Sequence, residues 1–230
     1  MLKLMSLEIR KNKLWGVLKG VLYANIGLLG FMLLILFTEK GTSDSTFASY
    51  AEVFDGLFVF VKAVFIIFAA VLLSKLVIDE YKNNTISILF MYPISRKKLM
   101  TSKLIIVFLF TLASILFSNV ILGAILIGIN NVVNIIPGEL TLNLITTALY
   151  KDVMGALYAA GIGLIPLYVG MRKKSVPATI VTAVLVTSLI TSGFDQFRPG
   201  NLAAVSIALG LLGVGIAYLS IRKVEIDDIA

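Results

Sequence analysis

Long apolar runs separated by short polar segments dominate the sequence. A helix that crosses the hydrocarbon core of a bilayer needs about 20 apolar residues, and all its backbone polar groups must be bonded within the helix. Six runs meet this requirement, at about 17–38, 56–78, 103–129, 144–170, 176–194 and 202–221. The third and fourth runs exceed the necessary length, so these helices can tilt or kink, and Pro166 lies near the end of the fourth. The pattern predicts an all-α polytopic membrane protein with six transmembrane helices.

The segments between these runs are too short to hold a further domain. The longest of them, between the second and third runs, has about 25 residues, whereas independent domains begin at roughly 50 residues. We therefore predict that residues 1–230 form a single transmembrane domain.

A different pattern, with the period of a helix, precedes the first run. One stripe of residues 2–14 is polar and consists of Lys3, Ser6, Arg10 and Lys13. Leucine, methionine and isoleucine occupy the other side of the same helix. Such a helix lies in the plane of the lipid headgroups and turns into the first span. The alternative is a basic segment that only sets the topology.

The polar segment 79–102 contains an apolar stretch that a simple connection between two spans does not need. It begins with acidic residues, ends with basic residues, and carries apolar side chains at 86–91. Something should cover these side chains, so we predict a short helix across the membrane surface that presents them to a partner. A helix half sunk in the headgroups is the alternative, because the flanking Arg and Lys also suit lipid phosphates.

The positions of the basic residues predict the orientation in the membrane. Most of the 20 Lys and Arg lie before the first span, between the second and third, between the fourth and fifth, or after the sixth. Basic residues near span ends are retained on the cytoplasmic side, so both termini are predicted to be cytoplasmic. The net charge of +7 thus reflects membrane topology and does not indicate nucleic-acid binding.

The composition excludes several kinds of chemistry. Hydrophobic residues make up 59% of the chain and charged residues only 14%, and there is no His and no Cys. Imidazole acid–base catalysis, a thiol nucleophile and thiolate or imidazole metal sites are therefore excluded. The sequence also lacks a G-x-x-x-x-G-K-[ST] phosphate loop, so the chain is not itself an ATPase. We expect no catalytic activity, no metal site and no bound cofactor in this chain.

Three charged residues lie inside predicted spans, where charges are costly and are candidates for function. They are Lys62 in the second span and the neighbours Lys151 and Asp152 in the fourth. One hypothesis is an ion pair between Lys62 and Asp152. The alternative is that each side chain extends its charged end to the outer membrane interface.

The segment 78–98 contains two characteristic runs, Ile78-Asp79-Glu80-Tyr81-Lys82-Asn83-Asn84-Thr85 and Leu89-Phe90-Met91-Tyr92-Pro93-Ile94-Ser95-Arg96-Lys97-Lys98. These runs resemble the cytoplasmic loop of bacterial ABC-2-type transporter permeases. The Leu- and Lys-rich start of the chain is similar to the elbow helix of these permeases, and the six-span layout matches theirs over the whole chain. The chain looks most like six-span permeases of the bacitracin-resistance and lantibiotic-immunity group, whose relatives include exporters of amphipathic peptides.

The resemblance implies that this loop forms a coupling helix, which docks into a groove on a separate ATP-binding subunit. Glu80 and Tyr81 would then lie at the entry to the contact. The full set of implied contact residues is Glu80, Tyr81, Thr85, Ile86, Leu89, Phe90, Tyr92, Arg96 and Lys97. ATP and Mg²⁺ would be bound by the partner subunit, beside a second copy of this permease or a related one.

The resemblance further implies an exporter of the bacterial cell membrane that moves amphipathic or antimicrobial peptides, for export or self-immunity. A secondary transporter or channel driven by an ion gradient, without an ATPase partner, is the alternative from another class. It would need ionisable residues near the middle of the membrane, and few are present.

Overall fold

Every regular element among the described residues is a helix. The computed structural model describes residues 2–11, 15–38, 47, 49–82, 96–136, 138, 140–191 and 203–223. In chain order the elements are α1 (Leu2–Lys11), α2 (Trp15–Thr38), α3 (Tyr50–Leu73), the π-helical turn η1 (Ser74–Ile78), α4 (Asp79–Lys82), α6 (Arg96–Val133), α7 (Leu142–Ile162), α8 (Pro166–Lys173), α9 (Val176–Thr191) and α10 (Ala203–Lys223). Over these ranges the predicted all-α fold class is confirmed.

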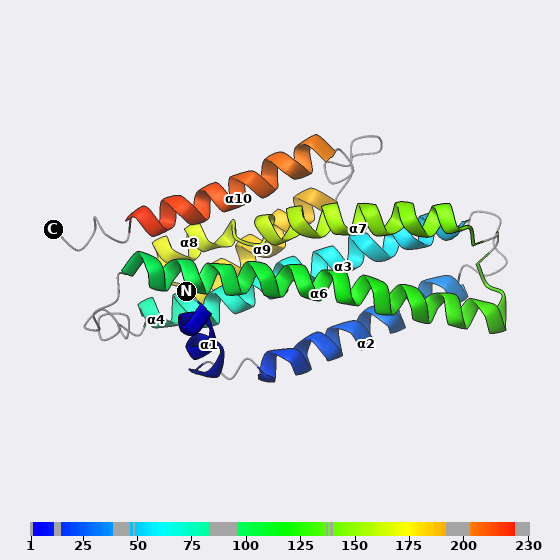
Figure 1. Ribbon diagram of the computed structural model, residues 1–230, viewed down its shortest axis with the longest axis horizontal. Coiled ribbons are helices and arrows are strands. Elements are labelled where there is room, and N and C mark those ends of the chain that lie inside the picture. Colours follow the sequence, from blue (N-terminus) through cyan, green and yellow to red (C-terminus); the bar gives the residue numbers. More distant parts are fainter. Residues whose placement is uncertain are drawn as a thin grey trace.

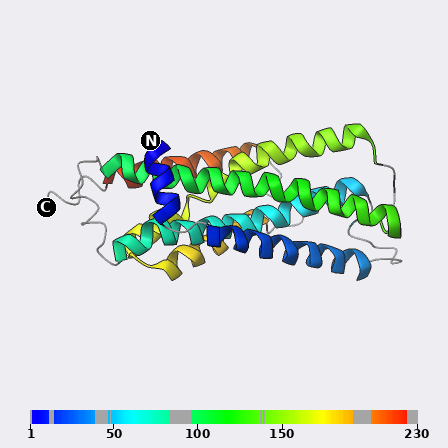
Figure 2. The ribbon, with the colours of Figure 1, turned by 60° about the horizontal axis from the view of Figure 1, so that its bottom comes forward.

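The long helices lie side by side along the long axis of the molecule (Figure 1). Helix α3 packs against α6, α7 and α9, and α10 packs against α7. The short helix α1 lies across the bundle at one end and contacts α6 (Figure 2). We call this the α1 end; the connection between α6 and α7 lies at the opposite end.

Four helical stretches are long and apolar enough to cross a membrane. They are Gly16–Thr38, Tyr50–Lys82, Lys97–Val133 and Leu142–Lys173. Two shorter apolar helices, Val176–Thr191 and Val205–Ser220, follow them. The first of these two has 16 residues, a length of about 24 Å against a hydrocarbon core of about 30 Å. Four of the predicted spans are thus present by length and composition, and the fifth and sixth stay predictions.

The second and third spans extend further than the hydrophobicity pattern predicts. The second begins at Tyr50, because the Ser49 hydroxyl accepts a hydrogen bond from the Glu52 amide at 3.4 Å and caps the helix. At its other end η1 and α4 continue it to Lys82, and α6 already begins at Arg96. The predicted loop 79–102 therefore has helical ends, and only residues 83–95 separate them.

The helix of the fourth span is broken just before Pro166. Helix α7 ends at Ile162, a turn follows, and α8 begins with Pro166. Proline has no N–H and cannot continue the helical hydrogen bonds, so the break occurs at its N-terminal side. Helix α8 ends at Lys173, and the C-cap residue Lys174 has a left-handed backbone with φ 46°.

A buried asparagine closes the end of α6 that is remote from α1. The Oδ1 atom of Asn130 accepts hydrogen bonds from the amides of Ile135 and Ile136, both at 2.7 Å. Its Nδ2 atom donates to the Tyr50 hydroxyl at 2.5 Å. The side chain thus joins the turn after α6 to the first residue of α3.

Helices α7 and α10 approach closely at paired glycines. A Cβ atom at Gly213 would lie only 2.0 Å from the carbonyl oxygen of Gly161, and one at Gly161 would lie 2.6 Å from the carbonyl oxygen of Gly210. Small residues permit such close backbone packing between helices in lipid. Gly161, Gly210 and Gly213 therefore serve the packing of α7 against α10 within the chain.

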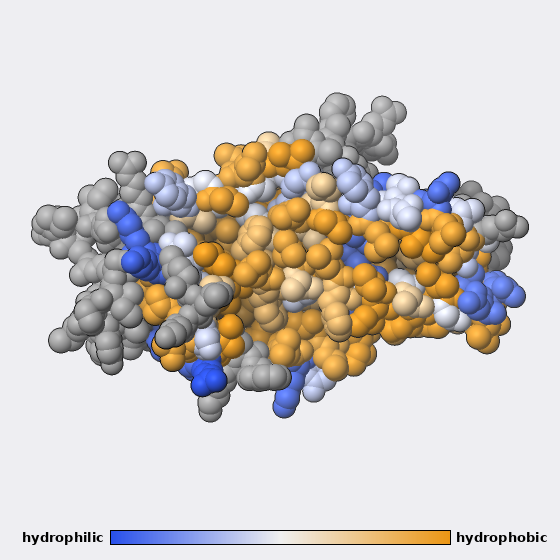
Figure 3. Space-filling model, viewed as in Figure 1, coloured by the Kyte–Doolittle hydropathy of each residue, from blue (hydrophilic) through white to orange (hydrophobic). Residues whose placement is uncertain are grey.

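Apolar side chains cover the middle of the face seen in Figure 3, and hydrophilic ones gather toward both ends. Large apolar side chains are widely exposed on α2, α9 and α10; Tyr23, Leu189 and Leu211 are 70%, 70% and 68% exposed. An apolar surface of this extent suits lipid and not water. The described helices therefore form a multi-pass membrane protein.

Candidate functional site

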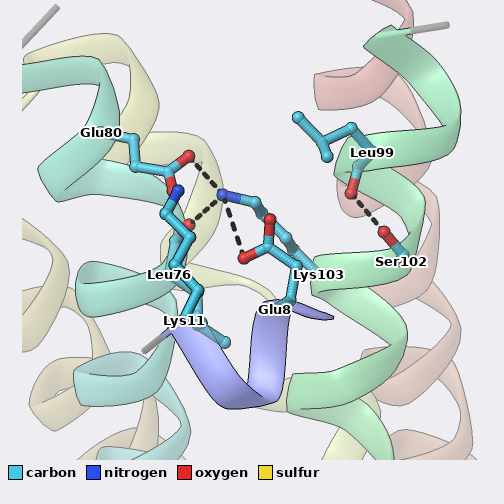
Figure 4. A network of polar contacts seen from close by, with 7 residues as sticks. All are labelled: Glu8, Lys11, Leu76, Glu80, Leu99, Ser102 and Lys103. Carbon is cyan, nitrogen blue, oxygen red and sulfur yellow. Dashed lines mark hydrogen bonds and ion pairs between the residues drawn. The ribbon is translucent and has the colours of Figure 1, made fainter. Parts of the chain in front are cut away.

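A buried lysine joins three helical elements at the α1 end (Figure 4). The Nζ atom of Lys103, on α6, donates a hydrogen bond to the Leu76 carbonyl oxygen in η1 at 2.8 Å. It also donates to the Glu80 carboxylate on α4 and lies 3.7 Å from Oε2 of Glu8 on α1. Lys103 is 0% exposed, Glu8 4% and Glu80 8%. One ammonium group therefore holds together the first helix and both flanks of the segment 83–95.

A second lysine balances the charge of this cluster. The Lys11 ammonium donates to Oε1 of Glu80 at 2.8 Å, and the Lys11 side chain is 49% exposed. Two carboxylates thus meet two ammonium groups. Buried charges are tolerated when they are paired and hydrogen-bonded, and this condition is met here. We call Glu8, Lys11, Glu80 and Lys103 the ionic clasp.

The sequence places each member of the ionic clasp by ordinary helical geometry. Glu8 and Lys11 are three residues apart and share one face of α1. In η1 the Asp79 amide bonds to the Ser74 carbonyl, five residues back, which defines a π-helical turn, and the carbonyl that accepts from Lys103 lies in this turn. Lys103 lies within the first turns of α6, next to buried apolar neighbours.

Only part of the predicted ATPase contact lies within the described residues. Thr85, Ile86, Leu89, Phe90 and Tyr92 lie outside them, and of Arg96 only the backbone is described. Lys97 is exposed on the first turn of α6, and Tyr81 is partly buried against the apolar cluster at the α1 end. The side chain of Glu80 is directed inward and holds the two lysines of the clasp, and its place at the entry to the ATPase contact stays a prediction.

The predictions missed Glu8, Lys11 and Lys103 as site residues. In the sequence Lys103 resembles the other basic residues near the ends of spans, and Glu8 is an acidic residue within a basic segment. A signal for Glu8 was present, because at 100° per residue it falls on the side of α1 opposite the polar stripe of Lys3 and Arg10. A carboxylate on the apolar side of an amphipathic helix indicates a buried partner.

The charged residues inside the spans have other partners than the ones proposed. Lys62 is 7% exposed, and its ammonium lies 5.0 Å from the centroid of the Phe58 ring, a cation–π contact. Lys151 pairs with Asp55 at 3.1 and 3.2 Å. Both side chains of the hypothesised ion pair, Lys62 and Asp152, are described, and the structure shows no salt bridge between them.

The ion pair of Asp55 and Lys151 lies at an open pocket of about 270 Å³ between the first turns of α3 and α7. Phe54, Leu144 and Thr147 also line it. Both charged side chains are more than half exposed, so the pair has the character of a surface contact. Among the described residues no group of three or more acidic side chains could hold a metal ion.

Comparisons with known proteins give the family of this chain. Residues 4–189 match the family model described as ABC-2 family transporter protein. Over 227 residues the chain is 41% identical to the uncharacterized protein YcbO of Bacillus subtilis (strain 168). The alignment covers 99% of this chain and 100% of that relative. No solved structure is significantly similar to this chain. The chain therefore belongs to the ABC-2 transporter family, as the membrane component of an ABC transporter that works with an ABC ATP-binding subunit.

Proposed function

We propose that this chain is the transmembrane subunit of an ATP-driven exporter of the bacterial cell membrane. ATP and Mg²⁺ are bound by separate ATP-binding subunits, and a second copy of this permease or a related one completes the transporter. In this proposal α1 is the elbow helix in the headgroup plane, and α9 and α10 are the fifth and sixth spans. The basic residues at the α1 end support a cytoplasmic location for both termini.

The residues 83–95 dock on the ATP-binding subunit in this proposal. Ile86, Leu89 and Phe90 fill the groove of the partner, Thr85 and Tyr92 flank them, and Arg96 and Lys97 surround the contact. The observation that carries the proposal is the ionic clasp, since it joins Glu80 and Lys103 on either side of the docking segment. A push on a segment held in this way moves α3 and α6 together as rigid bodies.

The test is co-purification with the ATP-binding subunit, with Phe90→Asp as the variant and Leu142→Asp as its matched control. Leu142 is 81% exposed at the opposite end of the molecule, so its substitution adds the same charge away from the docking segment. We expect Phe90→Asp to lose the partner and Leu142→Asp to retain it. Retention by Phe90→Asp would contradict the docking proposal. Transport that needs an ion gradient but no ATPase would support the secondary-transporter alternative.

The proposed substrate is an amphipathic or antimicrobial peptide, which the family resemblance suggests and which a broad apolar surface in the membrane can accommodate. Expression of the permease with its ATP-binding subunit is expected to raise the tolerated concentration of bacitracin or of a lantibiotic several-fold. Unchanged tolerance to both, with ATPase binding intact, would contradict the substrate proposal alone.

A further inference from the structure

We propose that the ionic clasp makes α1 a moving part of the coupling device, with Lys103 as the positioning residue. When the ATP-binding subunit changes state, α1 is carried along with the docking segment 83–95 because Glu8 is held by Lys103. This inference rests on the proposed function, since the docking segment must first receive the motion.

The connectivity of the clasp supports this role. A contact between α4 and α6 alone would be enough to join the two helices that flank the docking segment, and Lys103 supplies this contact through Glu80. The additional ion pairs to α1, formed by Glu8 and Lys11, are not needed to join those two helices. Their effect is to attach a helix that is distant in sequence to the same ammonium and carboxylate groups.

Because the charged groups are buried, α1 is held rigidly against α6. Lys103 is fully buried, and Glu8 and Glu80 are each more than nine-tenths buried. Moving α1 away from α6 would leave charges in the interior without their partners, which is strongly unfavourable. Helix α1 also packs against α6, and Met5 contacts the apolar cluster at this end. Displacement of α6 is therefore passed to α1.

The arms of the clasp differ in strength, which makes one of them suitable for a test. Lys103 bonds directly to Glu80 and to the Leu76 carbonyl, whereas Oε2 of Glu8 lies at 3.7 Å, beyond hydrogen-bond distance. Glu8 is the member of the clasp that links α1 to Lys103, so neutralising its charge tests that link directly. Glu8→Gln keeps the shape of the side chain and leaves the bond between Lys103 and Glu80 in place.

The test uses the absence of cysteine from the chain, which allows single spin labels. One label is placed at Ser6→Cys, on the exposed side of α1, and another at Lys98→Cys, on the exposed side of α6. The permease is purified with its ATP-binding subunit in lipid nanodiscs, and spectra are recorded with and without a non-hydrolysable ATP analogue and Mg²⁺. In the parent both labels are expected to change their mobility on nucleotide binding.

In Glu8→Gln the response at Ser6 is expected to become smaller, because only the pair of Lys11 and Glu80 and the packing of α1 on α6 still attach the helix, while the response at Lys98 and the co-purification of the ATPase persist. Arg10→Gln, which removes an exposed charge from the same helix, is the matched control and is expected to keep both responses. Glu8→Asp retains the charge and is expected to recover the Ser6 response at least in part. Equal loss in Glu8→Asp and Glu8→Gln would assign the effect to packing and overturn the role of the clasp.

Four further outcomes separate this inference from the proposed function. A full Ser6 response in Glu8→Gln, or a parent in which Lys98 responds and Ser6 does not, overturns the inference and leaves the docking proposal standing. A parent that binds no ATP-binding subunit, or in which neither label responds, overturns both.

Discussion

Single polar side chains decide how the ends of these apolar helices are held. Asn130 and Lys103 are both buried, one near each end of α6, and each joins elements that are far apart in the sequence. In a low-dielectric interior a satisfied polar network specifies one arrangement, whereas a half-satisfied one is costly. Substitutions at such positions should therefore act on the structure well beyond their own helix.

Asn130→Ala is expected to lower the free energy of unfolding by about 1–3 kcal/mol, because it leaves buried amides of the turn after α6 without an acceptor. Asn130→Asp keeps the acceptor oxygens for Ile135 and Ile136 and loses the donor to Tyr50, so its effect should be smaller. Thermal unfolding in detergent measures both. Asn143→Ala, an exposed amide at the same end, is the control and should change little. An equal loss in the control would contradict the role of Asn130.

The environment of Lys62 predicts which residue it is coupled to. A double-mutant cycle of Lys62→Met with Phe58→Leu should give an interaction energy of about 0.5–2 kcal/mol, because the ammonium lies over the ring. The cycle of Lys62→Met with Asp152→Asn should be additive within about 0.5 kcal/mol. Unfolding free energies of the four-member cycles decide the matter. Coupling to Asp152 in place of Phe58 would restore the ion-pair hypothesis.

At the scale of the element, packing depends on where the helices can approach one another. Helix α10 packs most extensively against α7, and the carbonyl of Gly161 fits directly against Gly213. The position of α10 against α7 therefore depends on Gly161, Gly210 and Gly213, which have no side chains.

Gly213→Ala should displace α10 from α7 and lower the free energy of unfolding by roughly 1–3 kcal/mol, because the new Cβ has no space. Gly215→Ala is the matched control in the same helix, since nothing lies within 4 Å of its Cβ position. It should be neutral or slightly stabilising, because alanine favours helix. Protease sensitivity around α10 and thermal unfolding report both effects. Equal behaviour of the two variants would show that the close approach is unimportant.

Helices and helix breaks could be predicted from the sequence where a single local feature determines them. The helical period before Trp15 predicted α1, and Pro166 predicted the break between α7 and α8. The start of α3 lies before the predicted one, because a hydrogen bond that the Ser49 hydroxyl accepts from the Glu52 amide caps the helix beyond the apolar run. The π-helical turn at Ser74–Ile78 has no local signal of this kind.

The site was less accessible from sequence than the elements. Glu8, Glu80 and Lys103 come from segments far apart in the chain, and their charges resemble the ordinary basic and acidic residues at span ends. Only their three-dimensional meeting gives them a role. The docking side chains Leu89 and Phe90 were singled out by the apolar stretch and the resemblance, and they stay predictions.

For the whole molecule, the two ends of the helical bundle are predicted to face opposite sides of the membrane, and cysteine labelling can test this topology. With six spans, a cysteine at Lys98 should react with membrane-impermeant maleimide only after the cytoplasmic side is opened. Cysteines at Leu142 and at Gln196, between α9 and α10, should react from outside. Exclusive reaction of Gln196→Cys from the cytoplasmic side would mean that α9 and α10 do not cross the membrane.

The order of the clasp residues along the chain has a consequence for biosynthesis. Glu8, Lys11 and Glu80 are made before Lys103, so during synthesis the clasp lacks its buried cation until the third span begins. This cation arrives only when the start of the third span has emerged, and it can be buried only after α1, α4 and α6 have come together. Closure of the clasp is thus a late event of membrane insertion, which ties the correct threading of the first three spans to the formation of a stable α1 end.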